Sequence, residues 1–206
     1  GHDLDDNELI PDGVFGFIGA LSGTPPVVGF EQPVNQAILG SSADLTFTGE
    51  ITTTEVKLDK VTLTVDVTDV ENGSTVGSFK VSNVASDADK IVSWNPDVEK
   101  DDNAKFKYAW KFTLTDAPEY SKYKAESGDN RIYMYTVTAE ARDASGGENT
   151  ANRTVTVDTV PPEVTITSVI PSVTGYTDAN HSDASAVYVN GTITITGAIN
   201  EMNLKS

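Results

Sequence analysis

The residues of this sequence best suited to chemistry are its oxygen donors. Asp and Glu number 31 against 14 Lys and Arg, and many stand in stretches rich in Gly and Asn such as "DASGGEN". Carboxylate and amide oxygens are the ligands that Ca²⁺ prefers in proteins. The candidate calcium ligands are Asp143, Glu148, Asp158, Asn200 and Glu201. No stretch has the spacing of an EF-hand loop, and ordinary turns use the same residue types, so solvated turns are the alternative interpretation.

Aromatic residues near loops form a second kind of candidate site. Trp94, Tyr120 and Tyr123 could stack on carbohydrate rings if their faces are exposed, because such side chains combine a large apolar face with a polar group. Tyr120 and Tyr123 lie in a polar segment with two lysines. Burial in a hydrophobic core is the alternative, and we favour it for Trp110, which lies inside an alternating apolar segment.

The sequence contains few of the residue combinations that form catalytic sites. The sequence has no Cys, and its only histidines are His2 and His181, so nucleophile and base pairs of the Ser/His or Cys/His kind lack their parts. No acid stands in an apolar stretch except Asp66 and Glu140, whose position in the alternation points them outward. We therefore expect a protein that is not an enzyme.

The charge of the chain limits its partners. A net charge of −17 opposes binding to nucleic acid and to anionic lipid surfaces. No apolar run approaches the ~20 residues of a membrane-spanning helix. The apolar run "GVFGFIGALSG" at 13–23 follows a stretch that includes Asp3, Asp5, Asp6 and Glu8 rather than the basic start of a secretion signal, so we interpret it as part of the mature chain.

Alternation of apolar and polar residues with a period of two dominates the rest of the sequence. In "KVTLTVDVT", for example, Val61, Leu63 and Val65 share one face while Thr62 and Thr64 share the other. This pattern is typical of antiparallel sheets that are apolar on one side, and it predicts an all-β sandwich without substantial helices. The predicted strands are 26–31, 44–52, 60–68, 75–82, 89–94, 104–115, 131–142 and 150–158.

Two Pro-Pro pairs divide the chain. Pro25 and Pro161 lie 136 residues apart, and each pair is followed by a short apolar segment and then by a segment with a central glycine, "LTFTGEI" and later "ITITGAI". Proline pairs stiffen a chain and interrupt a sheet, so they suit a boundary between domains. We therefore predict a leader at 1–23, a sandwich domain at 24–159, and the beginning of a second module at 160–206, incomplete because only its first strands are present.

The segments "YTVTAEARDASGGENTANRTVTVDTVPPEVTI" and "LTFTGEITTTEVKLDKVTLTVDV" resemble immunoglobulin-like (Ig-like) repeats of bacterial surface proteins. The likeness covers about 24–166 and begins again at 160–206. It implies an extracellular or cell-surface protein whose modules serve as stalks, spacers, adhesins or accessory domains of larger enzymes. The module of roughly 135 residues exceeds the ~100 of a standard sandwich, with the excess in "WNPDVEKDDNAKF" and "APEYSKYKAESGDN".

A sandwich of this topology gives the candidate calcium ligands a place. The loop before the last strand lies at the N-terminal end of the module, where Asp143 and Glu148 would face a preceding module. Asp158 leaves the opposite end and would face Asn200 and Glu201 of the next module. A cation shared there would neutralise crowded carboxylates and stiffen the joint.

Three functions follow from these observations. The first is a non-catalytic spacer or adhesion module in a repeat array, whose partners are neighbouring Ig-like modules. The second is a subunit of a surface filament or layer assembled from copies of itself by strand exchange, with "GVFGFIGALSG" as the donor strand. The third is a carbohydrate-binding accessory module that recognises glycans. Asn-x-Ser/Thr triplets that a host could glycosylate occur at Asn72, Asn152, Asn180 and Asn190.

Overall fold

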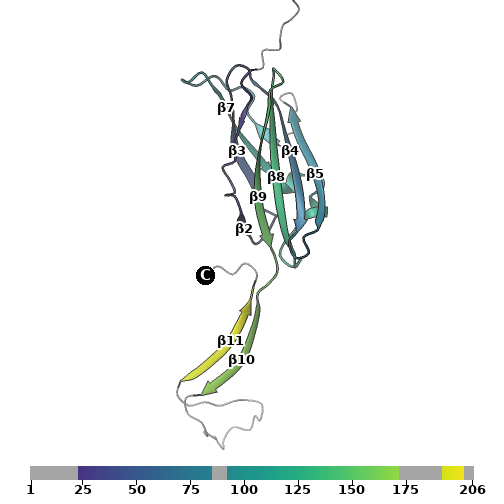
Figure 1. The fold of residues 1–206 in the computed structure, drawn as a ribbon, viewed down its shortest axis with the longest axis vertical. Helices are drawn as coiled ribbons and strands as arrows, with labels where there is room; N and C mark the ends of the chain where they lie inside the picture. Colours follow the sequence, from purple (N-terminus) through teal and green to yellow (C-terminus); the bar gives the residue numbers. More distant parts are fainter. Residues whose placement is uncertain (1–22, 85–91, 172–191, 202–206) are drawn as a thin grey trace, which may run out of the picture. The chain divides into compact units, whose positions relative to one another are not determined.

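The computed structural model describes residues 23–84, 92–171 and 192–201. The chain divides into two compact units between Thr159 and Val160. Nearly all of the regular structure is β-strand, arranged in antiparallel sheets, so the predicted all-β fold is confirmed: an Ig-like sandwich followed by part of a second module (Figure 1). No helix in the described residues is long and apolar enough to cross a membrane.

The first sheet of the sandwich has the strand order β1-β3-β7-β6, with every neighbouring pair antiparallel. Its strands are β1 (Val27–Val28), β3 (Thr46–Thr53), β7 (Phe106–Thr113) and β6 (Val92–Trp94). β3 lies between β1 and β7, so both of its edges are paired. The predicted strand at 89–94 is confirmed only at its end, because 85–91 lie outside the described residues.

The second sheet has the order β2-β9-β8-β4-β5. Its strands are β2 (Ala37–Leu39), β9 (Glu148–Asp158), β8 (Ile132–Asp143), β4 (Leu58–Asp69) and β5 (Thr75–Val84). All pairs are antiparallel except β2 and β9, which run parallel. The sequence analysis missed β2, because three residues are too few for an alternating pattern and Ile38 of this strand is 41% exposed.

The core fills the space between the two sheets, as the alternation predicts. On β4 the apolar residues Val61, Leu63 and Val65 are fully buried while the threonines between them are half-exposed. On β7 the aromatic residues Tyr108 and Phe112 are equally buried. Burial of these large side chains is the main source of stability for a sandwich of this size.

Residues 114–123, which the sequence analysis assigned partly to the strand at 104–115 and partly to the loop "APEYSKYKAESGDN", contain short helical turns. A 3₁₀ turn, η3 (Leu114–Asp116), is followed by a single α-helical turn, α1 (Tyr120–Tyr123). The ring of Tyr123 stacks on that of Phe79 with centroids 5.3 Å apart. Gly77 makes room for it, since a Cβ there would lie 2.7 Å from the Tyr123 ring. The sequence predicts no substantial helix, and α1 is a single turn that packing rather than periodicity holds in place.

The chain that leads into the sandwich is attached to β9 along its length. The side chain of Asn149 donates to the carbonyl of Pro26 at 2.9 Å, and the guanidinium of Arg153 donates to the carbonyl of Phe30 at 2.7 Å. Farther along, the backbone N–H of Gln36 donates to the carbonyl of Thr154. The first described residues thus contribute β1 to one sheet and β2 to the other.

The second unit is a β-hairpin of β10 (Glu163–Pro171) and β11 (Ile193–Asn200). The two strands pair antiparallel, with Val164 opposite Ile199 and Ile166 opposite Gly197. Thr167 is an extra residue at which the register shifts. Among the described residues, β11 pairs only with β10, so it is not inserted into a sheet of the first unit.

This hairpin reproduces the β1–β3 pair of the first unit residue by residue. Val28 faces Ile51 as Val164 faces Ile199. Both Glu31 and Gln32 donate their N–H to the carbonyl of Thr48, so the β1–β3 pair also has an extra residue. That residue is Glu31, which stands 136 positions before Thr167. The β1–β3 pair and the β10–β11 hairpin thus share a register and a β-bulge.

The central glycines of the two pairs are equivalent as well. A Cβ on Gly49 would lie 1.9 Å from the carbonyl oxygen of Gly29, and a Cβ on Gly197 would lie 2.5 Å from that of Thr165. Gly29 and Thr165 each stand four residues after the first proline of their Pro-Pro pair. In both places the glycine lets the neighbouring backbone approach closely.

Candidate functional site

Asp143, the first candidate calcium ligand, is a buried turn residue. Its side chain is only 2% exposed, and its Oδ1 accepts hydrogen bonds from the N–H of Ser145 (2.9 Å), the hydroxyl of Ser145 (2.7 Å) and the N–H of Gly147 (2.9 Å). Gly146 has a φ of 87°, which the turn requires. One carboxylate oxygen is therefore committed to closing the turn between β8 and β9.

This turn lies at the N-terminal end of the module, where the sequence analysis placed it. A Cβ on Gly23 would lie 3.3 Å from the hydroxyl of Ser145, so the turn contacts the first described residue of the chain. Glu148 follows the turn and is exposed. Arg142, which is opposite Glu148 in the β8–β9 ladder, forms an ion pair with Asp59, with Nη2 2.6 Å from Oδ2.

The remaining candidate ligands belong to two different units. Asp158 ends β9 of the sandwich and is half-buried, whereas Asn200 ends β11 and Glu201 follows it. Within the described ranges, no three His, Asp or Glu side chains come together as a metal-binding group. Calcium at the joint between modules therefore stays a prediction.

The aromatic residues predicted to stack on sugars are used mainly for packing. Trp94 is 5% exposed, and its partner in the β6–β7 ladder is Trp110. Tyr120 and Tyr123 are half-buried against the hydrophobic core. Trp94 is held in the core by strand β6, and helical turn α1 places the rings of Tyr120 and Tyr123 against the sandwich. Carbohydrate binding itself stays a prediction.

The hydroxyl groups of the tyrosines tie α1 to the rest of the fold. Tyr120 donates to Glu126 Oε1 at 2.5 Å, and its oxygen lies 3.3 Å from the hydroxyl of Ser42. Burial, together with the hydrogen bond to the Glu126 carboxylate, raises the pKa of Tyr120. Tyr135 donates to the carbonyl of Tyr123 at 2.5 Å, and burial raises the pKa of Tyr135 as well. This tyrosine cluster (Tyr120, Tyr123 and Tyr135) is a structural network.

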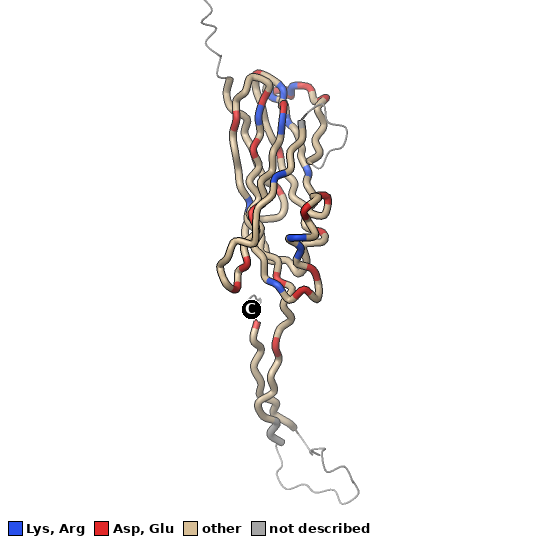
Figure 2. Tube along the Cα trace, turned by 90° about the vertical axis from the view of Figure 1, so that its right-hand side faces the viewer, with Lys and Arg blue, Asp and Glu red and all other residues tan. Residues whose placement is uncertain are grey.

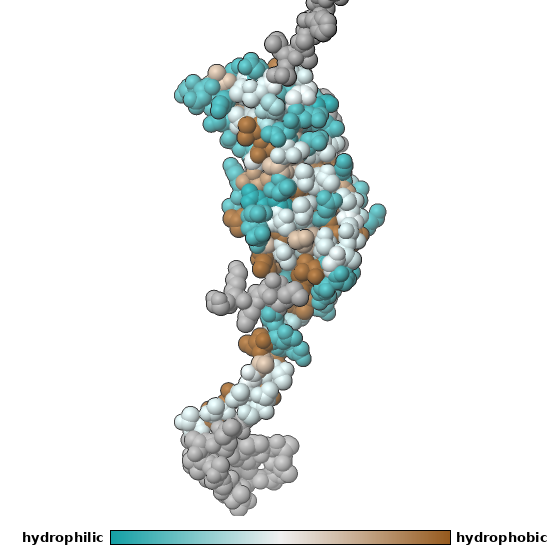
Figure 3. Space-filling model, viewed as in Figure 1, coloured by the Kyte–Doolittle hydropathy of each residue, from teal (hydrophilic) through white to brown (hydrophobic). Residues whose placement is uncertain are grey.

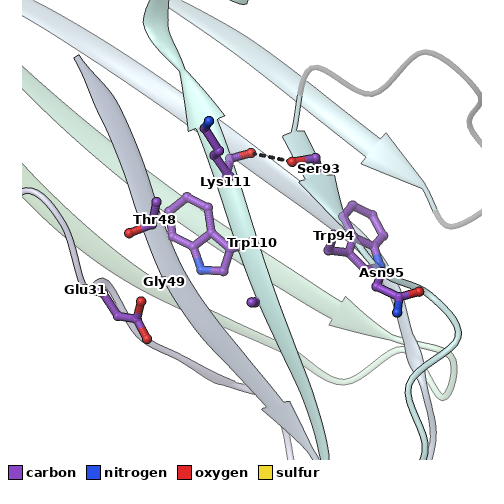
Figure 4. A pocket seen from close by; sticks show the side chains of 9 residues that line it. Glu31, Thr48, Gly49, Ser93, Trp94, Asn95, Trp110 and Lys111 are labelled. Carbon is purple, nitrogen blue, oxygen red and sulfur yellow. Dashed lines mark hydrogen bonds between the residues drawn. The ribbon is translucent and has the colours of Figure 1, made fainter. Parts of the chain in front are cut away.

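A shallow, open groove of about 520 Å³ lies on the first sheet (Figure 4). Its lining residues are Glu31, Thr48, Gly49, Ser93, Trp94, Asn95, Ala109, Trp110 and Lys111. The outward-facing members offer hydroxyl, amide, carboxylate and ammonium groups around the small side chain of Ala109. They suit weak hydrogen bonding to a polar molecule, and the lining contains neither a histidine nor a cysteine that could serve as a base or nucleophile.

The sequence analysis did not find this groove, because its residues come from four segments that only the folded sheet brings together. The one available signal was the small outward-facing residue Ala109 between Tyr108 and Trp110.

Two glycosylation triplets lie in the described part: Asn72 and Asn152 are both exposed, and the Asn72 amide donates to Asp69 at 2.9 Å. Asn180 and Asn190 lie outside the described residues.

Comparisons with known proteins give a fold-level likeness only. No family model matches the chain, and no curated protein matches it. Among solved structures, it is similar to the ASH / PapD-like domain of human CEP192 (PapD-like domain 7) with 10% identity and a TM-score of 0.30. That likeness covers 68% of this chain and 87% of the other, and at this TM-score it carries no argument about function.

Proposed function

We propose that this chain is a non-catalytic structural module of a repeat array in an extracellular or cell-surface protein, where it serves as a stalk or spacer. The observation that supports this function best is the equivalence of β10–β11 with β1–β3, in register, bulge and glycine. The same supersecondary unit occurs twice in one chain, each time after a Pro-Pro pair, which is the organisation of an array of modules.

The use of the polar residues supports the same proposal. The buried carboxylate of Asp143 closes a turn, and the buried hydroxyl of Ser42 accepts from the N–H of Ala125 at 2.9 Å. The tyrosine cluster fixes a helical turn on the sandwich. The polar side chains named above therefore hold loops of the sandwich in place. A spacer needs modules of fixed shape, and such loops help to provide them.

The location is tested by antibody labelling of intact cells of the source organism. We expect antibodies raised against the sandwich to label unbroken cells, and mild external protease to remove the signal. Labelling that appears only after lysis would contradict a surface role. A screen of hydrolase substrates tests the absence of catalysis, and turnover that survives purification to constant specific activity would contradict it.

Calcium at the joint is part of this proposal and has its own test. Small-angle X-ray scattering with Ca²⁺ and with EDTA measures the distribution of distances between the two units. We expect Ca²⁺ to narrow that distribution, and the double variant D158N/E201Q to remove the effect. Equal scattering under both conditions would exclude a cation at this joint while leaving the spacer function intact.

Strand exchange is a second candidate function, and one observation favours it. β3 pairs with β1 on one edge and with β7 on the other, whereas its equivalent β11 pairs only with β10 within the described ranges. An unpaired edge can accept a strand from another chain. The segment "GVFGFIGALSG" at 13–23 is the donor predicted from the sequence, and it lies almost wholly outside the described residues. A fluorescent peptide of this sequence should bind the protein if the exchange occurs.

A further inference from the structure

The turn between β4 and β5, "DVENGS" at 69–74, contains an asparagine followed by a glycine. Asn72, Gly73 and Ser74 are all exposed. Asparagine is among the least durable residues of proteins, because its side-chain amide can be lost. The amide carbon is attacked by the backbone nitrogen of the next residue, and a glycine there offers the least steric resistance. The pair in this turn therefore has the composition of a reactive site.

The backbone nitrogen of Gly73, the attacking atom in such a reaction, is not engaged in a hydrogen bond. The N–H of Asp69 donates to the carbonyl of Ser74 at 2.9 Å and closes the turn. The N–H groups of Glu71 and Asn72 donate to Asp69 Oδ1, and that of Ser74 donates to Asn72 Oδ1. The N–H of Gly73, in contrast, donates to no atom of the described residues. The nucleophile is therefore available in the folded chain.

The side chain of Asn72 is held by two hydrogen bonds. Its Oδ1 accepts from the N–H of Ser74 at 2.9 Å, and its Nδ2 donates to Asp69 Oδ2 at 2.9 Å. The first bond forms an Asx turn, which closes a ring around the peptide group that joins Asn72 to Gly73. Negative charge develops on Oδ1 when a nitrogen adds to the amide carbon, and an N–H already aimed at that oxygen stabilises it. The turn therefore favours the attack.

The surroundings of Gly73 leave room for a ring to form. Gly73 has a φ of 66°, and a Cβ built on it would have no atom within 4 Å. Hydrophilic and neutral residues cover most of the visible face of the first unit (Figure 3). Since the turn itself is exposed, water reaches it and can serve as the second reactant.

We propose that Asn72 and Gly73 form a self-modification site, at which the asparagine is converted to aspartate and isoaspartate without an enzyme. The Gly73 nitrogen loses its proton to water and bonds to Cγ of Asn72. The bond from Cγ to Nδ2 breaks, and the side-chain nitrogen leaves as ammonia. Water then opens the resulting cyclic imide: breaking the bond from Cγ to nitrogen leaves aspartate, and breaking the original peptide bond leaves isoaspartate. No group is oxidised or reduced.

Either product changes the β4–β5 turn. A carboxylate replaces the amide that donates to Asp69, so two like charges face each other where a 2.9 Å hydrogen bond was. Glu71 is next in the chain, and Figure 2 shows further acidic residues along the first unit, so the new charge adds to existing repulsion. Isoaspartate also lengthens the main chain by a methylene group. We expect the turn to loosen while the buried residues of both strands stay in place.

A matched comparison site occurs in the same unit. Asn152 is also exposed, but Arg153 follows it in the middle of β9. Thr154 bonds through its N–H and its carbonyl to residues 35–36, away from β8, so Arg153 directs its own N–H toward β8. That nitrogen is held in the sheet, and a large side chain hinders its approach. Asn152 should therefore stay intact under conditions that convert Asn72.

Peptide mapping of the full chain measures both sites. The protein, made in a host that does not glycosylate Asn72, is kept at neutral pH for several weeks and then digested with trypsin in mildly acidic buffer. Cleavage after Lys and Arg gives peptide 61–80, whose only asparagine is Asn72, and peptide 143–153, which contains Asn152. A second Asn-Gly pair, at 190–191, lies outside the described residues and falls in another peptide.

Mass spectrometry distinguishes the amide from the carboxyl group, and chromatography against synthetic peptides distinguishes aspartate from isoaspartate. We expect peptide 61–80 to convert at least tenfold faster than 143–153 and to give both products. Equal rates, or a peptide 61–80 that stays unchanged, would overturn the proposal.

The same measurement in urea tests the contribution of the folded turn. Unfolding removes the Asx turn at Asn72 and releases the nitrogen after Asn152 from the sheet. Asn72 should therefore convert no more slowly in the folded chain than in the unfolded one, whereas Asn152 should convert faster once unfolded. A folded chain that protects Asn72 relative to urea would contradict the role assigned to the turn.

The variant N72D imitates the aspartyl product and tests its effect on the fold. It should lower the melting temperature of the first unit, and added salt should reduce that shift by screening the new charge. The matched control N152D adds the same charge opposite Thr138 and should leave the melting temperature unchanged. Equal shifts for the two variants would contradict the expected loosening of the turn. The modification goes beyond the spacer function and does not depend on it, since surface labelling tests that function separately.

Discussion

The β1–β3 pair and the β10–β11 hairpin have the same local design in different surroundings. They share a register, an extra residue and a glycine that lets the neighbouring carbonyl approach. Yet the inward residues of the first pair are buried in a core, and those of the second are more than 40% exposed. Local sequence therefore determines how the two strands pair, while burial against a second sheet determines how much each side chain stabilises the fold.

Phe47→Ala and Ile195→Ala give the largest expected contrast between the two regions. Phe47 is fully buried, so its truncation should lower the free energy of unfolding by about 3–5 kcal/mol. Ile195 occupies the equivalent position on an exposed face, and its truncation should change that free energy by at most about 0.5 kcal/mol. Urea unfolding followed by Trp fluorescence reports the first unit, which contains both tryptophans. Similar losses for the two variants would contradict the difference in burial.

Gly49→Ala and Gly197→Ala test the close backbone approach. A Cβ on Gly49 meets the Gly29 carbonyl and also lies 2.7 Å from the Trp110 indole, so this variant should lose about 2–4 kcal/mol. A Cβ on Gly197 meets the Thr165 carbonyl in a hairpin without a described covering layer, and the unfolding midpoint of the first unit should not move. Thermal melting by circular dichroism measures both. An unchanged midpoint for G49A would show that the strands separate at little cost.

Asp143→Ala tests a feature that closes the first module and has no described counterpart in the second. Three hydrogen bonds to one carboxylate oxygen are lost, so we expect a destabilisation of about 1–3 kcal/mol. Glu148→Ala, five residues away and exposed, is the matched control and should change stability by less than about 0.5 kcal/mol. If EDTA lowers the melting temperature of the parent but not of D143A, the carboxylate holds a cation rather than only a turn.

The tyrosine cluster predicts a smaller, pH-dependent effect. Because the pKa of Tyr120 is raised in the folded state, its stabilising contribution is fully present below pH 10, the ordinary value, and is lost as the pH rises through the folded value. The parent should therefore lose stability above about pH 10, and Tyr120→Phe should reduce that slope. The denaturation midpoint measured from pH 8 to 11 checks this. A slope identical in parent and variant would assign the alkaline transition to other groups.

Much of the fold could be predicted from the sequence because alternation reports burial directly. Strands such as β4 and β8 bury every second residue, and their limits were predicted to within two residues. β2 and α1 were missed for a common reason: each is too short to show a period, and tertiary contacts hold it. Ile38 of β2 even points to solvent.

The candidate site was less predictable, because the sequence does not show what a loop residue touches. Asp143 has the composition of a ligand, but its hydrogen bonds close a turn. Tyr120 and Tyr123 stand among lysines in the sequence, yet they lie half-buried on the sandwich. Their packing partners, Ser42 and Phe79, are at least 40 residues away, so only the folded chain could reveal them.

The parallel pairing of β2 with β9 has a mechanical consequence. A pull that separates the two ends of the module moves these neighbouring strands in opposite directions along their length, which is shear. The bonds from Ala37–Leu39 to Val155–Val157, together with those of Pro26 and Phe30 to β9, then share the load and must break together rather than one at a time. Strands β2 and β9, together with the bonds of Pro26 and Phe30 to β9, thus bear the tension applied between the two ends of the module.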